Sequence, residues 1–186
     1  MEFLREELDR LKREDSYRWL RRVEGEQGPR MKVDGRDVVM LCSSNYLGLA
    51  SHPKLKEAAM KAAKEYGTSA SAARLISGNV ELYERLEERL AAFTGREAAL
   101  VYVNGYMANL GVIASVVGEG DLIISDELNH ASIVDGCRLS KADLQIFPHN
   151  DVGALEEILK KAASYRRRLI VVDGLYSMDG DLAPLP

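Results

Sequence analysis

From residue 97 onwards, short apolar stretches alternate with segments of helical periodicity, and this alternation restricts the chain to few folds. The apolar stretches cover residues 97–103, 121–125, 142–148 and 167–174, and a helical pattern follows each of the first three. Strands joined by helical crossovers pair in parallel and need helices on both faces of their sheet. We therefore predict an α/β fold with a mostly parallel sheet and flanking helices.

The first 50 residues have a different pattern. Leucines recur at helical spacing near the start, which predicts one helix or two short ones over residues 2–22. The dipeptide Asp34-Gly35 separates two apolar-rich stretches and is typical of the tight turn of a hairpin. We expect residues 1–50 to form an N-terminal helix-and-hairpin segment.

Two helices are predicted between this segment and the alternating region. The first covers residues 51–67, with Ser51 as its cap and Gly67 at its end. The second covers residues 80–95, and a loop of small residues, 68–79, connects them.

Composition excludes several classes of partner. The net charge is −4 and no basic stripe occurs, so we expect no nucleic-acid partner. No apolar run approaches the roughly 20 residues of a membrane helix, and the charged amphipathic start is unlike a signal peptide. Cys42 and Cys137 lack metal or redox spacing, which favours free thiols in the reducing cytoplasm.

Three strand-to-helix turns are candidate binding positions, because open parallel sheets bind ligands beyond the carboxyl ends of their strands. At the first turn, Asn104 can cap the following helix and Gly105 allows a ligand to approach the backbone. The free N–H groups of such a helix start suit a phosphate. The alternative is an ordinary capped helix.

The second turn carries Asn129 and His130, and the third carries Asp173 and Ser177. The imidazole can lie against a planar ligand, or it can simply cap its helix. Aspartates in the Asp-Gly-Asp stretch 179–181 could suggest a metal, but a turn is the favoured interpretation, and no matching His or Glu cluster occurs. A phosphate cradle, an imidazole and a hydroxyl together favour a phosphorylated planar cofactor.

Five stretches carry a family resemblance: SSNYLGLASHP, RLISGN, NGYMANLGV, SDELNHASIVDGCRLSKAD and VVDGLYSMDGDLAPL. In this order they resemble the α-oxoamine synthases, pyridoxal-phosphate enzymes with the fold of aspartate aminotransferase (fold type I). The resemblance runs from about residue 17 to the end of the sequence. It implies that residues 51–186 are the first half of the large domain that binds pyridoxal 5'-phosphate.

The resemblance implies a condensation between an amino acid and an acyl-CoA with loss of CoA. Its closest match is to the members that join L-alanine to a pimeloyl thioester in biotin synthesis. The members that transfer an acetyl group to glycine are the alternative. Ala73 and Leu75 stand where users of succinyl-CoA carry polar residues, which argues against that substrate.

The resemblance also assigns site residues. Gly105 and Tyr106 would hold the cofactor at the start of the phosphate-side helix, His130 would stack on its ring, and Ser177 would hydrogen-bond to it. Asn45 would lie near the carboxylate of the amino acid. Arg18 matches a substrate-contacting arginine, with Arg21 as a possible substitute.

Members of this family are about twice this length, so we expect the sequence to be the N-terminal portion of a longer homodimeric enzyme. The Schiff-base lysine and the Asp-x-Ala-His segment of the family come later and are absent from these 186 residues. Lys141, in RLSKA, superficially resembles the cofactor lysine, but the family has an ordinary helix end there. We expect the 186-residue chain alone to be inactive.

Two other classes remain open. The chain could be a non-catalytic partner or cofactor-binding module, although the lysine-less partners in sphingolipid synthesis are full length. A nicotinamide-binding domain is disfavoured, because no predicted strand is followed by G-x-G-x-x-G.

Overall fold

A computed structural model describes residues 2–185 and divides the chain into two compact units, Met1–Ala73 and Arg74–Pro186. Each unit is considered separately. The predicted division after residue 50 remains a prediction.

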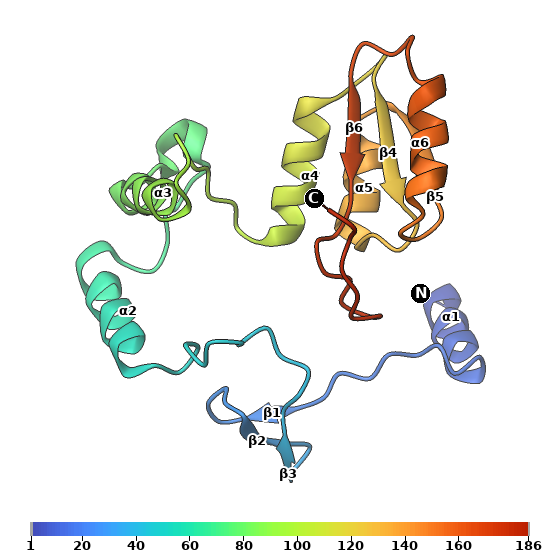
Figure 1. Cartoon of the computed structure of the whole chain (residues 1–186). Coiled ribbons are helices and arrows are strands. Elements are labelled where there is room, and N and C mark those ends of the chain that lie inside the picture. The colour runs from blue at the N-terminus through green and yellow to red at the C-terminus, as the bar shows by residue number, and fades with distance from the viewer. Residues whose placement is uncertain (1, 186) are drawn as a thin grey trace. The chain divides into compact units, whose positions relative to one another are not determined.

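The N-terminal unit contains two helices and a small antiparallel sheet (Figure 1). Its elements are α1 (Glu2–Arg13), β1 (Val23–Glu24), β2 (Arg30–Val33), β3 (Arg36–Val39) and α2 (Pro53–Tyr66). The helix predicted over residues 2–22 ends earlier, at Arg13. Asp15 adopts a left-handed φ of 51°, a backbone conformation that cannot continue a right-handed helix.

The predicted hairpin is confirmed. Strands β2 and β3 pair antiparallel with Val33 opposite Arg36, so Asp34 and Gly35 form a two-residue loop. Both loop residues have positive φ, 50° and 76°, as a type I′ turn requires. Strand β1 adds to the other edge of β2.

The cap predicted for α2 is wrong by one residue. His52, not Ser51, is the N-cap, and its Nδ1 accepts the N–H of Lys54 at 3.2 Å. The Ser51 hydroxyl donates instead to the carbonyl of Gln27. Pro53 follows at the first helical position, where a missing N–H costs nothing. Gly67 ends the helix as predicted.

The second unit contains the alternating strands and helices. Its elements are a π-helical turn (Arg74–Gly78), α3 (Glu81–Thr94), α4 (Gly105–Val116), β4 (Leu122–Asp126), α5 (Ala131–Leu139), β5 (Asp143–Phe147), α6 (Val152–Lys161) and β6 (Arg168–Val171). Three of the four predicted strands form a parallel sheet in the order β5-β4-β6, so the α/β prediction is confirmed.

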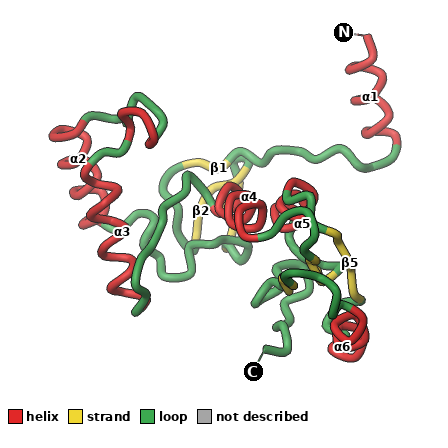
Figure 2. Tube along the Cα trace, turned by 90° about the horizontal axis from the view of Figure 1, so that it is seen from above, coloured by secondary structure: helices red, strands yellow, loops and turns green. Residues whose placement is uncertain are grey.

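The central strand β4 is buried on both faces. Ile123 packs with Ile113 of α4 and with Ile133 of α5. Leu122 and Ile124 project to the opposite face, among the side chains of α6. Figure 2 shows α4 beside α5, with α6 apart from them across β5. A strand covered on both faces has a continuous apolar run, as LII does here.

The strand predicted over residues 97–103 is not formed. A strand needs a neighbour for its ladder of hydrogen bonds, and within the described chain β4, β5 and β6 pair only with each other. The N–H of Val101 donates instead to the Glu87 carboxylate at 2.8 Å. The predicted loop 68–79 also differs in part, because Arg74–Gly78 is helical.

Within residues 2–185, no helix combines the length and apolarity that crossing a bilayer would require.

Candidate functional site

Asn129 and His130 join the second and third strand-to-helix turns. The amide of Asn129 donates to the Val171 carbonyl at 2.7 Å, and its Oδ1 accepts the N–H of Asp173 at 2.9 Å. The backbone N–H of His130 donates to Oδ2 of Asp173 at 2.8 Å. Asn129 is buried, so its role is to fix the end of β4 against the end of β6.

The His130 side chain caps its helix and still presents its ring outward. Its Nδ1 accepts the Ser132 N–H at 3.2 Å, which is the local capping contact expected in the alternative interpretation. The residue is nevertheless exposed. Its ring lies edge-on to that of Tyr106, with centroids 6.2 Å apart and planes at 75°. The first and second turns therefore meet.

The first turn has the donors that an anion needs. Asn104 caps α4 by accepting the N–H of Met107 at 2.9 Å. Among the described residues, no partner is found for the N–H groups of Gly105 and Tyr106, which point from the positive end of the helix dipole. Tyr106 also donates its hydroxyl to Asp135 on α5, and this bond raises the pKa of the tyrosine.

A pocket of about 330 Å³ lies at the second and third turns, and His130, Asp173 and Ser177 are among its lining residues. Its volume is at the lower end of the roughly 300–1,000 Å³ typical of small-molecule sites. In the part of the chain that the structure describes, the Ser177 hydroxyl has no hydrogen-bond partner and is exposed. The pocket thus combines an imidazole, a free hydroxyl and two carboxylates, those of Asp173 and Asp179.

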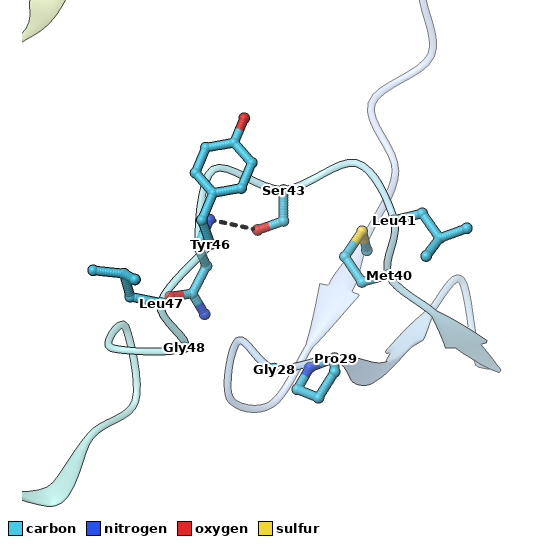
Figure 3. A pocket seen from close by; sticks show the side chains of 9 residues that line it. Gly28, Pro29, Met40, Leu41, Ser43, Tyr46, Leu47 and Gly48 are labelled. Carbon is cyan, nitrogen blue, oxygen red and sulfur yellow. Dashed lines mark hydrogen bonds between the residues drawn. The ribbon is translucent and has the colours of Figure 1, made fainter. Parts of the chain in front are cut away.

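A larger pocket of about 500 Å³ belongs to the N-terminal unit (Figure 3). Gly28, Met40, Leu41 and Tyr46 contribute to its wall, and Asn45 also lines it. Asn45 donates its N–H to Ser43 Oγ at 3.1 Å. This pocket offers few ionisable or nucleophilic groups. The pocket at the second and third turns is therefore the better candidate for chemistry, although it is the smaller of the two.

The arginine assignments remain predictions. Arg18 is exposed and has no ion-pair partner within residues 2–185. Arg21 pairs with Asp34 at 3.2 Å, which ties it to the hairpin turn. The role expected for Asn45 is likewise untested.

The turn after β5, PHND, was missed from the sequence. His149 lies between two carboxylates: its Nδ1 is 2.9 Å from Asp126 Oδ1, and its Nε2 is 2.8 Å from Asp181 Oδ2. Its hydrogen bonds to Asp126 and Asp181 raise the pKa of His149. The rule that selected the other three turns also applies to this one, so the strand-to-helix position was the available signal.

Asp126 is buried at the end of β4 and stays ionised. Burial opposes its charge, but hydrogen bonds from the Asn150 N–H, from His149 and from the Leu128 N–H outweigh it and lower the pKa of the carboxyl. Tyr176 packs edge-on to His149, with ring centroids 4.4 Å apart. Burial and the charge of Asp126 raise the pKa of Tyr176 to about 12.

Of the remaining candidates, Asp179 lines the smaller pocket, whereas Lys141 and Asp181 line neither pocket. Lys141 is exposed and follows α5 with a φ of 62°, so it stands just past the helix end. Asp181 contacts His149, and the described residues contain no group of three or more acidic, His or Cys side chains arranged to hold a metal ion. Cys42 and Cys137 are both free, as predicted.

Comparisons with known proteins are consistent with this arrangement. Residues 36–186 match the family described as Aminotransferase class I and II. An 8-amino-7-oxononanoate synthase from Geobacter sulfurreducens is 58% identical over 180 residues, which are 97% of this chain and 46% of the relative. One from Thermoanaerobacter pseudethanolicus is 51% identical, and the match covers 100% of this chain and 47% of the relative. The chain therefore spans about half the length of these relatives.

Solved structures show the same fold. A serine palmitoyltransferase from Sphingomonas wittichii superposes with a TM-score of 0.88 at 34% identity, over 98% of this chain and 46% of its own. An 8-amino-7-oxononanoate synthase from Francisella tularensis gives 0.64 at 27% identity, over 76% of this chain and 38% of its own. The palmitoyltransferase structures include one with a PLP internal aldimine.

Proposed function

Because the chain belongs to the aminotransferase class I and II family, we propose that its three converging turns bind pyridoxal 5'-phosphate in an acyltransferase. The reaction would join L-alanine to a pimeloyl thioester with release of CO₂ and the thiol, as in biotin synthesis. The identity of 58% to an 8-amino-7-oxononanoate synthase is the observation that carries this choice of substrates. Glycine acetyl transfer is the alternative.

The donor set of the site fits the cofactor. Two amides at the start of α4, those of Gly105 and Tyr106, have no partner within the described residues and suit a phosphate dianion. The exposed His130 ring and the Ser177 hydroxyl border one pocket, where a planar ring can be stacked and hydrogen-bonded. Pyridoxal phosphate supplies an electron sink for the carbanion at the α-carbon of the amino acid.

The residues of this chain would act mainly by orientation. The bond from the His130 N–H to Asp173 fixes the backbone on which the imidazole stands. The contact of Nδ1 with Ser132 limits rotation of the ring. An imidazole with restricted rotation would offer a fixed face for the cofactor ring to stack on, and fixing this orientation before the reaction is an entropic advantage. Asn45 and Arg18 are proposed to contact the substrate carboxylate.

Activity, homodimer formation and a cytoplasmic location are proposals for the whole protein, because the chain covers about half of its relatives. The test uses protein produced from the native gene, supplied with pyridoxal phosphate, L-alanine and pimeloyl-CoA. We expect CoA release with this pair and little with glycine and acetyl-CoA. The reverse preference would favour the acetyltransferase, and no release with either pair would contradict the proposal.

Variants connect the activity to the site. His130→Ala is expected to lower turnover roughly a hundredfold by removing the orienting ring. Ser177→Ala is expected to weaken cofactor retention during dialysis. Ser164→Ala, at an exposed serine outside both pockets, is the matched control and is expected to behave like the unaltered protein.

A further inference from the structure

Ser177 lies in a loop, residues 173–183. A few backbone contacts within this segment hold its two arms together. Leu175 and Leu182 form an isolated antiparallel bridge. The Tyr176 N–H donates to the Asp181 carbonyl at 3.0 Å, and the Gly180 N–H donates to the Tyr176 carbonyl at 2.8 Å. We refer to this segment as the Ser177 loop. Its internal bonds shape it but do not attach it to the sheet. Its first residue, Asp173, is held at the end of β4 by Asn129 and His130, so the question is what holds the part that follows.

The turn after β5 supplies an attachment from outside the loop. His149 Nε2 and Asn150 Nδ2 both contact Asp181 Oδ2, at 2.8 and 2.9 Å. The Asn150 amide also donates to the Leu182 carbonyl at 3.2 Å. The rings of His149 and the buried Tyr176 pack edge to face. The loop is therefore attached through a polar contact and an aromatic contact to the same histidine.

The other side of His149 is anchored in the sheet. Its Nδ1 lies 2.9 Å from Oδ1 of Asp126, whose side chain is fully buried at the end of β4. The Asn150 N–H donates to the other oxygen of Asp126 at 2.9 Å. Asp126 stands four residues before His130, so the same strand end supports the anchor and the helix start that carries the imidazole.

The two contacts of the ring require two protons on it. An ionised carboxylate only accepts hydrogen bonds, and a neutral imidazole has a single N–H. Bridging both Asp126 and Asp181 therefore needs the imidazolium form. The other ionisable groups that face His149 are the Glu127 carboxylate, which accepts the His149 backbone N–H at 2.9 Å, and the Tyr176 hydroxyl.

We propose that His149, as an imidazolium between Asp126 and Asp181, is a positioning residue that holds the Ser177 loop against the carboxyl end of β4. It does not line the pocket, and it acts on the pocket through the loop. The link to cofactor binding rests on the proposed function, whereas attachment of the loop does not.

Hydrogen exchange in the absence of cofactor tests the attachment directly. In His149→Phe, which keeps an aromatic ring against Tyr176, we expect the Ser177-loop amides to exchange about tenfold faster, as for the loss of one charge-assisted hydrogen bond. Asp181→Asn keeps the size of the side chain and should give a smaller increase, and it provides the test if His149→Phe fails to fold. Unchanged exchange in both variants would overturn the proposal.

Matched controls separate this effect from general destabilisation. Asp179→Asn neutralises an exposed carboxylate of the same loop that has no partner within the described chain, and exchange should not change. His52→Phe removes a histidine that caps α2 in the other unit, and it should leave the Ser177 loop unaffected. Equal acceleration in the controls would contradict a specific attachment.

The pH dependence of hydrogen exchange in the Ser177 loop gives an independent test of the imidazolium bridge. After correction for intrinsic exchange, opening of the Ser177 loop should increase as pH rises through the raised pKa of His149, because the bridging proton is lost. The increase should be absent in His149→Phe. A loop whose opening does not depend on pH in the unaltered protein would count against the imidazolium bridge.

Cofactor retention then separates the two proposals. Faster loop exchange together with weaker retention of pyridoxal phosphate in His149→Phe would support positioning of the site. Faster exchange with unchanged retention would overturn the role of His149 in positioning the cofactor site, but not its attachment of the loop. If the unaltered protein binds no pyridoxal phosphate, the proposed function fails, and the exchange result still decides whether His149 holds the loop.

Discussion

The strand-and-helix region around β4 and the N-terminal unit bury their apolar side chains to very different extents. Leu122, Ile123 and Ile124 of β4 are completely buried, whereas Leu20 and Leu41 of the N-terminal unit are 99% and 91% exposed. Met31 is the only buried residue among residues 2–73. Both regions contain regular helices and strands, so local structure alone does not produce a core. In this chain the core forms where a strand has neighbours on both edges and helices on both faces.

The largest difference is expected for the same substitution in the two regions. Leu122→Ala should lower the free energy of unfolding by about 2–5 kcal/mol, because it leaves a cavity between β4 and α6, whereas Leu20→Ala should change it by less than about 0.5 kcal/mol. Urea unfolding measures both values. An equally large loss at Leu20 would show that this side chain is covered in solution by a contact outside its own unit.

Adding a methyl group sharpens the comparison. A Cβ at Gly136 would lie 3.1 Å from the Asn109 carbonyl oxygen and 3.1 Å from Ile113 Cδ1, where α5 crosses α4. Gly136→Ala should therefore destabilise by about 1–3 kcal/mol through overpacking. Gly28→Ala in the N-terminal unit is the control, since its Cβ would meet nothing closer than 3.8 Å. Thermal unfolding should show a lower midpoint for the first variant only.

Acid stability should also differ between the regions. Hydrogen bonds from the Arg166 guanidinium hold the pKa of the buried Asp121 at about 2, below its ordinary 3.8. A lowered folded-state pKa contributes stability above about 3.8 that is lost as pH falls toward 2. In Asp121→Asn, stability should therefore depend less on pH between about 3.8 and 2. Midpoints of urea unfolding, measured across this pH range, test this. Asp34→Asn should change this dependence less, because Asp34 is partly exposed.

The smallest effect is expected at the surface of α1. Arg10 pairs with Glu7 and Glu14, but all three side chains are about half exposed, so solvent screens the pairs. Arg10→Ala should leave the midpoint of urea unfolding unchanged within error. A measurable drop would show that α1 contributes more to stability than its exposure indicates.

Much of the second unit could be predicted because its signals are local. Apolar runs separated by helical periodicity placed β4, β5 and β6, and Asn104 was recognisable as the cap of α4. Residues 97–103 have the same apolar composition, yet they form no strand, since strand formation depends on a neighbour elsewhere in the chain. The early end of α1 depends on the single backbone conformation of Asp15, which leucine spacing does not report.

Apart from residues 97–103 and Arg74–Gly78, the sequence by itself determined the kind of elements, the parallel sheet and the polar residues at the strand ends. It could do so because periodicity and capping act over a few neighbouring residues. Only the tertiary structure decided which of those residues meet. It placed the His130 ring beside Tyr106, joined the His130 N–H to Asp173, and set His149 between Asp126 and Asp181. The hydrogen bonds among these contacts join residues from 23 to 43 positions apart in the chain. That separation is closed only when the crossovers bring the strand ends to one edge of the sheet.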